Sequence, residues 1–398
     1  MSPPPAAVAV VNPRRANSVY PQPQLAGVGV AFKLLQALWS TLGREEDEVE
    51  SFLDLVCLGT VADMVPLVSE NRYLVKRGLE VLNGTGRIGL RELIKVTGLR
   101  LGVAFVRVLS WVLGPCLNAS GRISDAIIGY RLLVADSAEE AHQLALELEQ
   151  QNTRRKQLTE DTLTRAREQV LAAELDVPLL MIGGEDYHQG VIGLVAGRLV
   201  DEFHRPSIVF QREPEVTQGS ARSITEFDIV SALAECRGVI SQFGGHPMAA
   251  GFIMPTADVE QLRQCLLEVA RRQLAHIDFS PSISIDAEVR LSSVGRDFKG
   301  MSDIAPFGVG NQVPTLLSRN VKVMEHHAVG GGKHLRLKLQ DGNITWDGIG
   351  FGMGDRTNQA SQRIDIVYQM GVNHWRGEDT LELEVLDFAP SAGVAPSK

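Results

Sequence analysis

The sequence predicts an α/β fold with several domains and a small β-barrel at the end. Strand-like and helix-like segments alternate between residues 177 and 274, which is typical of an α/β domain. A long helix is expected before them, from Ala138 to about Leu175. From Ile283 the chain changes to short alternating strands with turns such as Gly330-Gly-Gly, and their number and size fit a closed barrel of the OB type.

The composition is that of an ordinary soluble globular protein. The 398 residues are 44% hydrophobic and 22% charged, and no apolar run reaches the length of a membrane span. Four cysteines without C-x-x-C spacing argue against a zinc ribbon or a disulfide scaffold, and they fit a reducing cytoplasm. We therefore expect a cytoplasmic protein without a membrane partner. A net charge of −9 does not suggest a nucleic-acid binder, but the distribution of charge decides that question.

The N-terminal part is expected to be mainly helical after one strand. The apolar run Ala6–Val11 predicts a buried strand. Gly114–Arg122, which contains two glycines and a proline, predicts a loop. Helices are expected in four stretches between them: Gly27–Leu42, a helix opened by the acidic residues Glu45–Glu50 that carries Phe52–Leu58, Asn71–Leu82 and Leu90–Val96.

The long helix should connect two bodies. Ser137-Ala-Glu-Glu140 is a capping box that opens it, and its middle, Glu149–Gln157, is almost wholly polar. A helix that is polar all round usually bridges two bodies through solvent. The resulting domain prediction is a first part at 1–136, the connecting helix at 137–175, an α/β domain at 176–278 and the barrel at 283–390.

Two short signatures mark the α/β domain as a candidate phosphate and nucleotide site. Gly219-Ser-Ala-Arg-Ser223 ends a predicted strand with two hydroxyls beside a guanidinium, which can grip phosphate bidentately. Gly244-Gly-His-Pro-Met-Ala-Ala-Gly251 leaves a flat surface of small residues. The alternative is a glycine-rich turn beside a well-packed alanine strand. The candidate binding residues are Ser220, Arg222, Ser223, Gly244, Gly245 and His246.

The two signatures resemble those of the RecJ family, single-strand-specific DNA exonucleases of the DHH phosphoesterase superfamily. The resemblance covers nearly the whole chain. It implies that residues 1–136 are the C-terminal part of a DHH catalytic domain and that 176–278 form a DHHA1-type substrate domain. The barrel would then be the family's OB-fold domain.

The resemblance also assigns roles in the first part of the chain. Thr60-Val-Ala-Asp-Met-Val-Pro-Leu67 resembles the family motif whose aspartate binds a catalytic divalent metal, so Asp63 is the expected ligand of Mn²⁺ or Mg²⁺. Asp54, one helix-length earlier, is expected on an ordinary helix surface. Asn118 and Arg122 match a family loop with phosphate contacts, although Arg122 could instead form a surface salt bridge. Cys116 stands where an arginine is common, which puts one phosphate contact in doubt.

Further candidates lie beside the helix near residue 190 and in the barrel. Tyr187-His-Gln-Gly190 resembles a family segment with tryptophan in place of Tyr187. His188 could bind nucleic acid or cap the following helix, whose free N–H groups could face an anion. The barrel offers a basic strand face, or a solvated edge, at Lys333, Arg336 and Lys338. Glu325-His-His327 only mimics the family's Asp-His-His motif and is expected on the barrel surface, while Trp346 and Trp375 could stack bases or fill the barrel core.

The family's other metal ligands, including the Asp-His-His triplet, do not occur before Asp63. The first histidine of the chain is His142. We therefore expect an N-terminally truncated RecJ-type 5′→3′ single-strand exonuclease with an incomplete metal site. The partner would be single-stranded DNA, with repair or replication proteins that the sequence does not identify. The alternatives are a non-catalytic single-strand-binding relative and a DHH-type phosphatase or oligonucleotide hydrolase.

Overall fold

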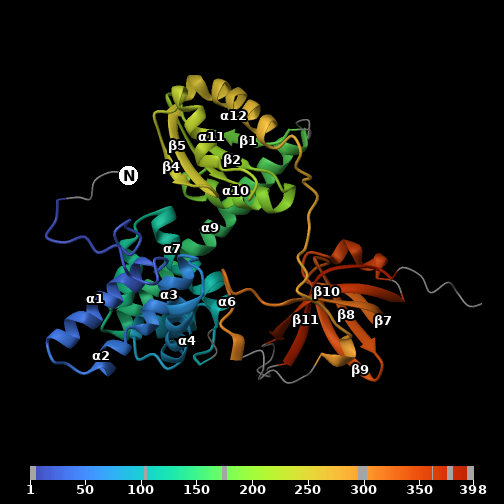
Figure 1. The fold of residues 1–398 in the computed structure, drawn as a ribbon, viewed down its shortest axis with the longest axis horizontal. Coiled ribbons are helices and arrows are strands. Elements are labelled where there is room, and N and C mark those ends of the chain that lie inside the picture. Colours follow the sequence, from blue (N-terminus) through green and yellow to red (C-terminus); the bar gives the residue numbers. More distant parts are fainter. Residues whose placement is uncertain are drawn as a thin grey trace, which may run out of the picture. The chain divides into compact units, whose positions relative to one another are not determined.

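The structure is a computed structural model that describes residues 6–102, 105–172, 177–294, 303–360, 362–373 and 380–391 (Figure 1). The chain forms two compact units. One consists of Met1–Leu82 together with Ile283–Lys398, and the other is Asn83–Ser282. The expected domain boundaries near residues 136, 175 and 278 stay a prediction. No helix of the described residues is long and apolar enough to cross a membrane.

The N-terminal part of the first unit is helical from Gly27 onward. Residues 6–20 form turns and irregular chain, so the expected strand Ala6–Val11 was wrong, and Val8 and Val11 are fully or largely exposed. A parallel strand is stable only when both of its faces are covered, and none of the described strands pairs with this run. The helices are α1 (Gly27–Thr41), α2 (Glu46–Glu50), α3 (Leu53–Ala62) and α4 (Ser69–Asn83).

A small core joins these four helices. Phe32 from α1, Val56 from α3 and Leu74 from α4 are all buried in it. Gly59 lets α1 approach α3 closely, because a Cβ there would lie 2.8 Å from the side chain of Val28. Most of the periodic apolar positions of α1 therefore lie on its inner face, as expected, although Leu38 is 48% exposed.

The C-terminal part of the same unit is a closed five-stranded barrel. Its strands follow the order β7-β8-β9-β11-β10, and a pairing of β10 with β7 closes it, while the short β6 (Ala287–Glu288) adds to β7. Trp346 is 3% exposed inside the barrel core, so it does not stack bases. Trp375 lies outside the described residues. The strand bounds are β7 Thr315–Val329, β8 His334–Asp341, β9 Ile344–Gly350, β10 Arg363–Asn373 and β11 Thr380–Pro390.

The segment before β7 contacts the chain that follows α3. The Arg72 guanidinium donates to the Ile304 carbonyl at 2.6 Å, and the Leu67 N–H donates to the Val309 carbonyl at 2.6 Å. Gly310 lies against Pro66, where a Cβ would be only 3.0 Å from the proline ring. Within this unit, the residues after Asp63 are therefore held by the chain that leads into the barrel.

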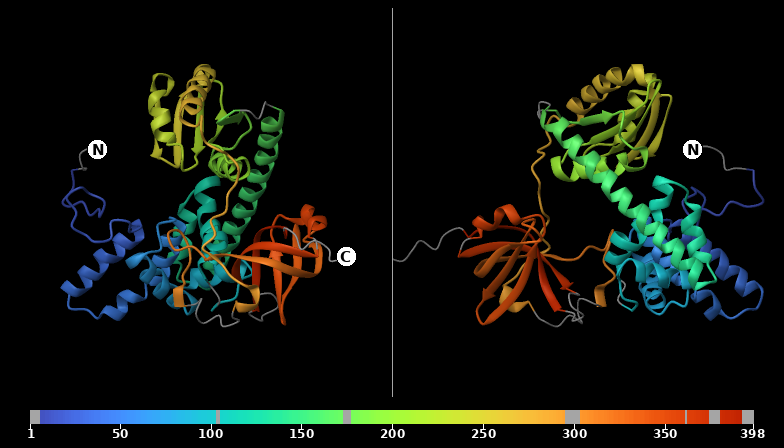
Figure 2. Two further views of the ribbon diagram at one scale, coloured as in Figure 1. Left: turned by 45° about the vertical axis from the view of Figure 1, so that its right-hand side comes forward. Right: turned by 180° about the vertical axis from the view of Figure 1, so that it is seen from behind.

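The second unit starts with helices gathered along α9 (Ala138–Ala172), the long helix that Figure 2 shows in both views. One of the two hydrogen bonds of the expected capping box is present, since the Ser137 hydroxyl accepts from the Glu140 N–H at 3.1 Å, while the Glu140 carboxylate accepts from Arg131 Nη2 at 2.8 Å. The middle of α9 is not wholly solvated, because Asn152 is 2% exposed. The helices packed in this part are α5 (Ile88–Val96), α6 (Val106–Val108), α7 (Gly114–Ile123) and α8 (Ile127–Val134).

Helix α7 corrects the expected loop at Gly114–Arg122. A π-helical turn, Leu109–Leu113, runs directly into α7, and Pro115 stands at its beginning, where the missing N–H is tolerated. Gly121 serves close packing, because a Cβ there would meet the Ala126 methyl at 3.3 Å. The turn-forming residues were thus used for packing and for starting a helix.

The rest of this unit is a five-stranded sheet in the order β1-β2-β3-β5-β4. Strands β1 and β2 are parallel, and the other neighbours are antiparallel. The Gly-Gly-His signature forms the hairpin of β4 and β5. The elements are β1 Leu180–Gly184, α10 Gln189–Phe203, β2 Ser207–Arg212, β3 Val216–Arg222, α11 Ile229–Glu235, β4 Gln242–His246, β5 Ala249–Pro255 and α12 Val259–Gln273.

The two faces of this sheet are covered differently. One face packs on α11 and α12 through a large apolar core that includes Phe210, Phe252 and Leu262. On the other face, α10 and the end of α9 cover β1 and β2 through Val195, Val209 and their neighbours. The second face of β3, β5 and β4 extends beyond α10, and its residues in β5 and β4 are largely exposed. This half-open face is where a ligand can reach the sheet.

A disulfide joins Cys236, at the end of α11, to Cys265 in α12, with the Cα atoms 6.0 Å apart. The spacing of the cysteines had argued against disulfides, and this pairing overturns that expectation for two of the four. Cysteines that are distant in sequence met because α11 and α12 share one face of the sheet. Cys57 and Cys116 are free and buried.

Candidate functional site

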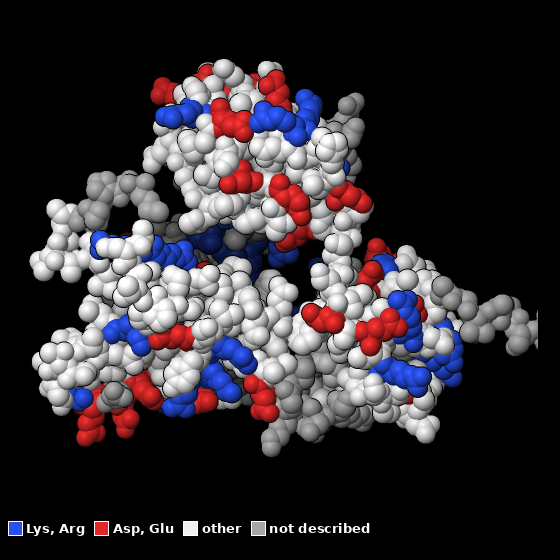
Figure 3. All heavy atoms as spheres, viewed as in Figure 1, with Lys and Arg blue, Asp and Glu red and all other residues white. Residues whose placement is uncertain are grey.

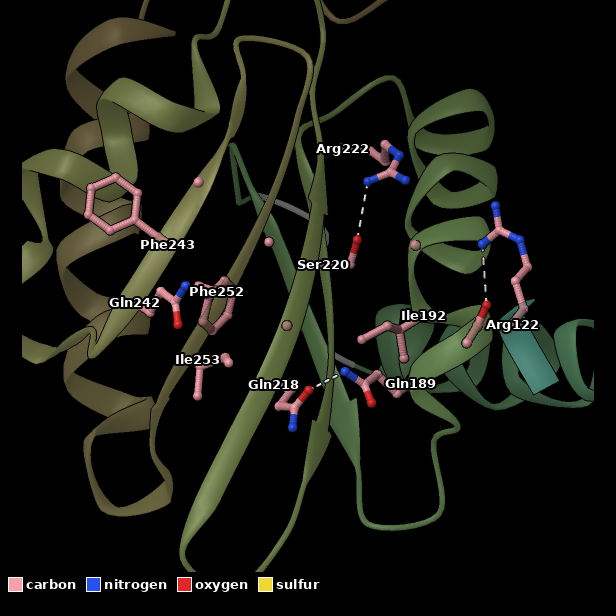
Figure 4. A pocket seen from close by; sticks show the side chains of 15 residues that line it. Arg122, Gln189, Ile192, Gln218, Ser220, Arg222, Gln242, Phe243, Phe252 and Ile253 are labelled. Carbon is pink, nitrogen blue, oxygen red and sulfur yellow. Dashed lines mark hydrogen bonds between the residues drawn. The ribbon is translucent and has the colours of Figure 1, made fainter. Parts of the chain in front are cut away.

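A pocket of about 430 Å³ lies on the half-open sheet face beside α10 (Figure 4). Its lining comes from the end of α7, the first turn of α10 and strands β3, β4 and β5. No acidic residue stands among the described residues that line it. They are Arg122, Gln189, Gly190, Ile192, Gly193, Gln218, Gly219, Ser220, Arg222, Gln242, Phe243, Gly244, Gly251, Phe252 and Ile253.

The strand register sorts the open face into three parallel rows. Each row contains one residue from β3, β5 and β4 in that order, and neighbouring rows are two residues apart along the strands. Alternate residues of a strand share a face, so all three rows face the pocket side of the sheet. The rows are Arg222–Ala249–His246, Ser220–Gly251–Gly244 and Gln218–Ile253–Gln242.

Arg222 is the half-buried cation of the pocket. Its Nη1 donates to the Ser220 hydroxyl at 3.1 Å and to the Ala221 carbonyl at 2.8 Å. Gly193 makes room for it, because a Cβ there would lie 3.0 Å from Arg222 Nη2 and 2.9 Å from Ser220 Oγ. Burial lowers the pKa of Arg222, and the positive charge of Arg122 lowers it further. The guanidinium and the hydroxyl are thus held together without a carboxylate partner among the described residues.

Arg122 reaches the same pocket from the end of α7. Its Nη1 donates to the Gly190 carbonyl at 3.3 Å, and Gly190 is required because a Cβ would lie 2.0 Å from the Arg122 carbonyl oxygen. The alternative of a surface salt bridge finds no support, since none of the ion pairs between described residues includes Arg122. Arg122 is therefore free to meet a ligand.

Two further arginines belong to this positive cluster and were missed in the sequence. Burial lowers the pKa of Arg155 in α9, and the charges of Arg122 and of Arg198 in α10 lower it further, while the nearby Glu149 carboxylate acts in the opposite direction. Arg155 is held by Asn152, whose Oδ1 accepts from Nε at 3.3 Å and Nη2 at 3.0 Å. The feature of the sequence that could have revealed Arg155 is the polar middle of α9, which had been interpreted as a bridge through solvent. An anion bound among these like charges would relieve their repulsion.

The glycines of the two signatures have different roles. Gly244 and Gly251 leave a side-chain-free floor, since a Cβ at Gly244 would meet no atom within 4 Å. Gly245 instead has φ of 151°, and a Cβ there would lie 2.3 Å from the Ala249 carbonyl oxygen, so the hairpin requires it. Gly219 makes room for the Phe252 ring on the covered face and not for an anion, because a Cβ there would lie 2.2 Å from that ring.

Of three other predicted site residues, one lies on the pocket face of the sheet and two have structural contacts instead. His246 is exposed and ends the row that contains Arg222. Ser223 points to the covered face, is 4% exposed and donates to the Phe227 carbonyl at 2.6 Å, so it does not reach a pocket ligand. His188 caps α10, because its Nδ1 accepts from the Gly190 N–H at 3.0 Å. That bond and the bonds of the Val191 and Ile192 N–H groups to the His188 carbonyl occupy donors that were expected to face an anion.

Known protein families match the two regions that form the α/β domain and the barrel. The DHHA1 domain model matches residues 168–274, and the RecJ OB domain model matches residues 285–387. The single-stranded-DNA-specific exonuclease RecJ of Bacillus subtilis is 37% identical over 96% of this chain and 49% of its own length. The RecJ of Dickeya dadantii is 31% identical over 95% of this chain and 70% of its own length.

This chain belongs to the RecJ family. The crystal structure of RecJ from Thermus thermophilus in complex with Mn²⁺ superposes with a TM-score of 0.83 at 27% identity, covering 100% of this chain and 58% of that one. The chain thus spans about half the length of the Bacillus relative and 58% of the Thermus chain. The DHHA1 and OB domains expected from the sequence are confirmed.

Asp63, the RecJ-type metal ligand expected from its motif, is exposed at the C-terminal cap of α3. Across the residues that the structure describes, no group of three or more His, Cys, Asp or Glu side chains is placed to hold a metal ion. A two-metal hydrolytic site needs several such ligands at once. The described residues therefore do not fit a complete Mn²⁺ or Mg²⁺ site. Asp54 of α3 was expected on the helix surface, but it is buried, with only 2% of its surface exposed.

The replacement at Cys116 concerns packing and not phosphate in this RecJ chain. Cys116 is fully buried between α7 and α9, and its Sγ donates to Glu149 Oε2 at 3.4 Å. Burial, with the Glu149 carboxylate, raises the pKa of this thiol to about 12. Asn118 lies one helical turn before Arg122, on the exposed side of α7, and does not line the pocket.

The barrel's basic strand is partly neutralised. Arg336 Nη1 lies 3.2 Å from Glu382 Oε2, and Lys338 Nζ lies 3.7 Å from Glu325 Oε1. Lys333 is exposed and forms no ion pair with a described residue. Figure 3 shows basic and acidic side chains interspersed over the barrel. As expected, Glu325, His326 and His327 are exposed on β7.

Proposed function

We propose that this chain binds the 5′-phosphorylated end of single-stranded DNA in the pocket beside α10. In this proposal the pocket positions the DNA end for a RecJ-type exonuclease reaction, which hydrolyses phosphodiester bonds in the 5′→3′ direction. Arg222 and Ser220 hold the terminal phosphate, with Arg122 beside them. The floor of Gly244 and Gly251 carries the strand, and His246 lies at its edge.

The half-buried guanidinium of Arg222 carries this proposal. A buried cation is usually paired with a carboxylate, because an unpaired charge in a low-dielectric site is costly. Arg222 instead contacts a hydroxyl and a carbonyl, and its charged neighbour is Arg122. The site supplies donors and positive charge, which are what a phosphate requires.

The test is a titration of matched single strands with and without a 5′-phosphate. Arg222→Ala should weaken binding of the phosphorylated strand by about 1.5–3 kcal/mol, the contribution of a hydrogen bond to a charged group. The unphosphorylated strand should bind almost as before. Arg271→Ala is the matched control, because Arg271 is exposed on α12, on the other face of the sheet. Equal weakening for both strands would remove Arg222 from the phosphate site.

A non-catalytic single-strand-binding role is the second candidate. It is favoured by one observation, namely that the described residues supply Asp63 without a group of further metal ligands around it. A DHH-type phosphatase acting on short substrates is less well supported, since a strand-tracking OB domain serves long substrates. Metal-dependent cleavage by the purified chain would exclude the binding-only role.

A further inference from the structure

The pocket has two chemically different ends. In Figure 4, Arg222 is the uppermost of the labelled side chains, and Gln218 and Gln189 are the lowest. The upper end is cationic. The lower end offers amides and apolar surface from Gln189, Gln218, Gln242 and Ile253. A volume of about 430 Å³ is in the range of small-ligand sites and exceeds what one phosphate group fills.

The strand register sets the separation of the two ends. Gln218 precedes Arg222 by four residues on β3, and both face the pocket. At about 3.3 Å per residue the two rows are roughly 13 Å apart. This separation is comparable with the length of one nucleotide from its phosphate to the far edge of its base.

The amide end has the chemistry to hold a base. Gln189 Nε2 donates to Gln218 Oε1, which joins the first residue of α10 to β3. The pair keeps free donors on Gln218 Nε2 and a free acceptor on Gln189 Oε1. Ile253 is 37% exposed in the row between Gln218 and Gln242, so an apolar side chain is available for the face of a base while amides meet its edge.

We propose that this glutamine end receives the base of the 5′-terminal nucleotide and accepts all four bases. The inference rests on the proposed function, because it places the terminal phosphate at Arg222. Every base edge carries donors or acceptors, and a primary amide supplies both kinds of group. The amide pair therefore increases the affinity for a strand with a terminal base, whichever of the four bases it is.

The experiment is a binding cycle on the full chain with four single strands. They combine a 5′-phosphate or 5′-hydroxyl with a terminal thymidine or a terminal abasic residue. Removing the terminal base should weaken binding to the unaltered chain about tenfold, as expected for one to two hydrogen bonds. Replacing thymidine by the other bases should change affinity far less. Gln218→Ala should reduce the base effect to about twofold or less and leave the phosphate effect unchanged.

Gln189→Ala and Gln261→Ala complete the design. Gln189 is exposed at the start of α10, so its loss should remove the base effect without disturbing the sheet. Gln261 is exposed on α12 and serves as the control that should keep the base effect. An intact phosphate effect in each variant shows that the pocket is folded. A base effect that is absent, or equal in all variants, would overturn the inference alone. Absence of the phosphate effect in the unaltered chain would overturn the proposed function as well.

Discussion

At the scale of single residues, Gly244 and Gly245 lack a side chain for opposite reasons. A side chain on Gly244 would enter open space above the pocket floor. A side chain on Gly245 would collide with the backbone of β5 and require a left-handed conformation. Gly244 therefore keeps the surface of the pocket free of side chains, whereas Gly245 is needed for the hairpin itself.

We predict that Gly244→Val folds normally but binds single strands at least about tenfold more weakly, because the isopropyl group fills the floor. Gly245→Val should instead lower the free energy of unfolding of the α/β domain by about 1–3 kcal/mol, because the backbone at this position would be strained. Thermal unfolding and strand titration on both variants separate the two effects. Unchanged binding by a folded Gly244→Val variant would show that the strand does not cross this floor.

The face of the sheet on which a residue lies was predictable where the alternation of a strand decides it. Ser220 and Arg222 are two residues apart on β3 and share the open face, so the pair was identified correctly as a juxtaposition. The same alternation places Ser223 on the covered face, and applying it strictly would have removed Ser223 from the candidate set. Arg155 and Arg198 could not be found this way, because their neighbourhood with Arg122 comes from helix packing.

At the scale of elements, α11 supports the floor of the site from behind, since it packs against β4 and β5. Its N-cap is Asp228, whose Oδ1 accepts from the Val230 N–H at 3.0 Å and the Ser231 N–H at 3.1 Å. These hydrogen bonds, that of the Ser231 N–H first, lower the pKa of Asp228 below its ordinary value of 3.8. The cap is therefore fully formed above pH 3.8 and is lost as the pH falls through the lower folded value.

We predict that Asp228→Ala destabilises α11 by about 1 kcal/mol and accelerates hydrogen exchange of its amides about fivefold. Asp228→Asn is the control, because it keeps a capping oxygen without a titrating charge. It should remain close to the unaltered chain at neutral pH and lose the acid dependence below about pH 4. Exchange rates that do not respond to Asp228→Ala would mean that α11 is held by packing alone.

The pairing of β8 side chains changes what we expect from the barrel. If Lys333, Arg336 and Lys338 all contacted phosphates, removing them would reduce the slope of log affinity against log salt by about 2 for a single strand. Because Arg336 and Lys338 already face carboxylates, we predict a reduction of about 0.7, from Lys333→Ala alone. Titration at several salt concentrations decides this, and a slope unchanged by Lys333→Ala would make the barrel purely structural in binding.

Elements with strong periodicity were predicted well, and elements set by context were not. The helices at α1, α4, α5 and α9 lie close to their expected ranges. The segment at α7 looked like a loop because Gly and Pro usually interrupt structure, yet Pro115 starts a helix and Gly121 packs against Ala126. The run Ala6–Val11 looked like a strand, but a strand forms only where a neighbouring strand pairs with it.

At the scale of the whole molecule, the pocket that we propose for the phosphate and the motif that we expect to bind metal belong to different units. The pocket is complete within Asn83–Ser282, since every residue that lines it belongs to that unit. Asp63, the metal ligand that the family motif leads us to expect, belongs to the other unit. Binding therefore rests on residues that are present together, whereas hydrolysis rests on a ligand set that the described residues do not assemble.

We therefore predict that this chain by itself binds 5′-phosphorylated single strands but does not cleave them, even in millimolar Mn²⁺. One exposed aspartate holds a divalent ion too weakly to activate water, because such sites share the charge among several ligands. Fusion to a RecJ segment that carries the Asp-His-His triplet should establish cleavage, and Asp63→Ala in that fusion should abolish it while strand binding persists. Arg271→Ala in the same fusion should leave both intact. Degradation of single strands by the unfused, purified chain would show that the metal ligands lie elsewhere than Asp63 and its motif.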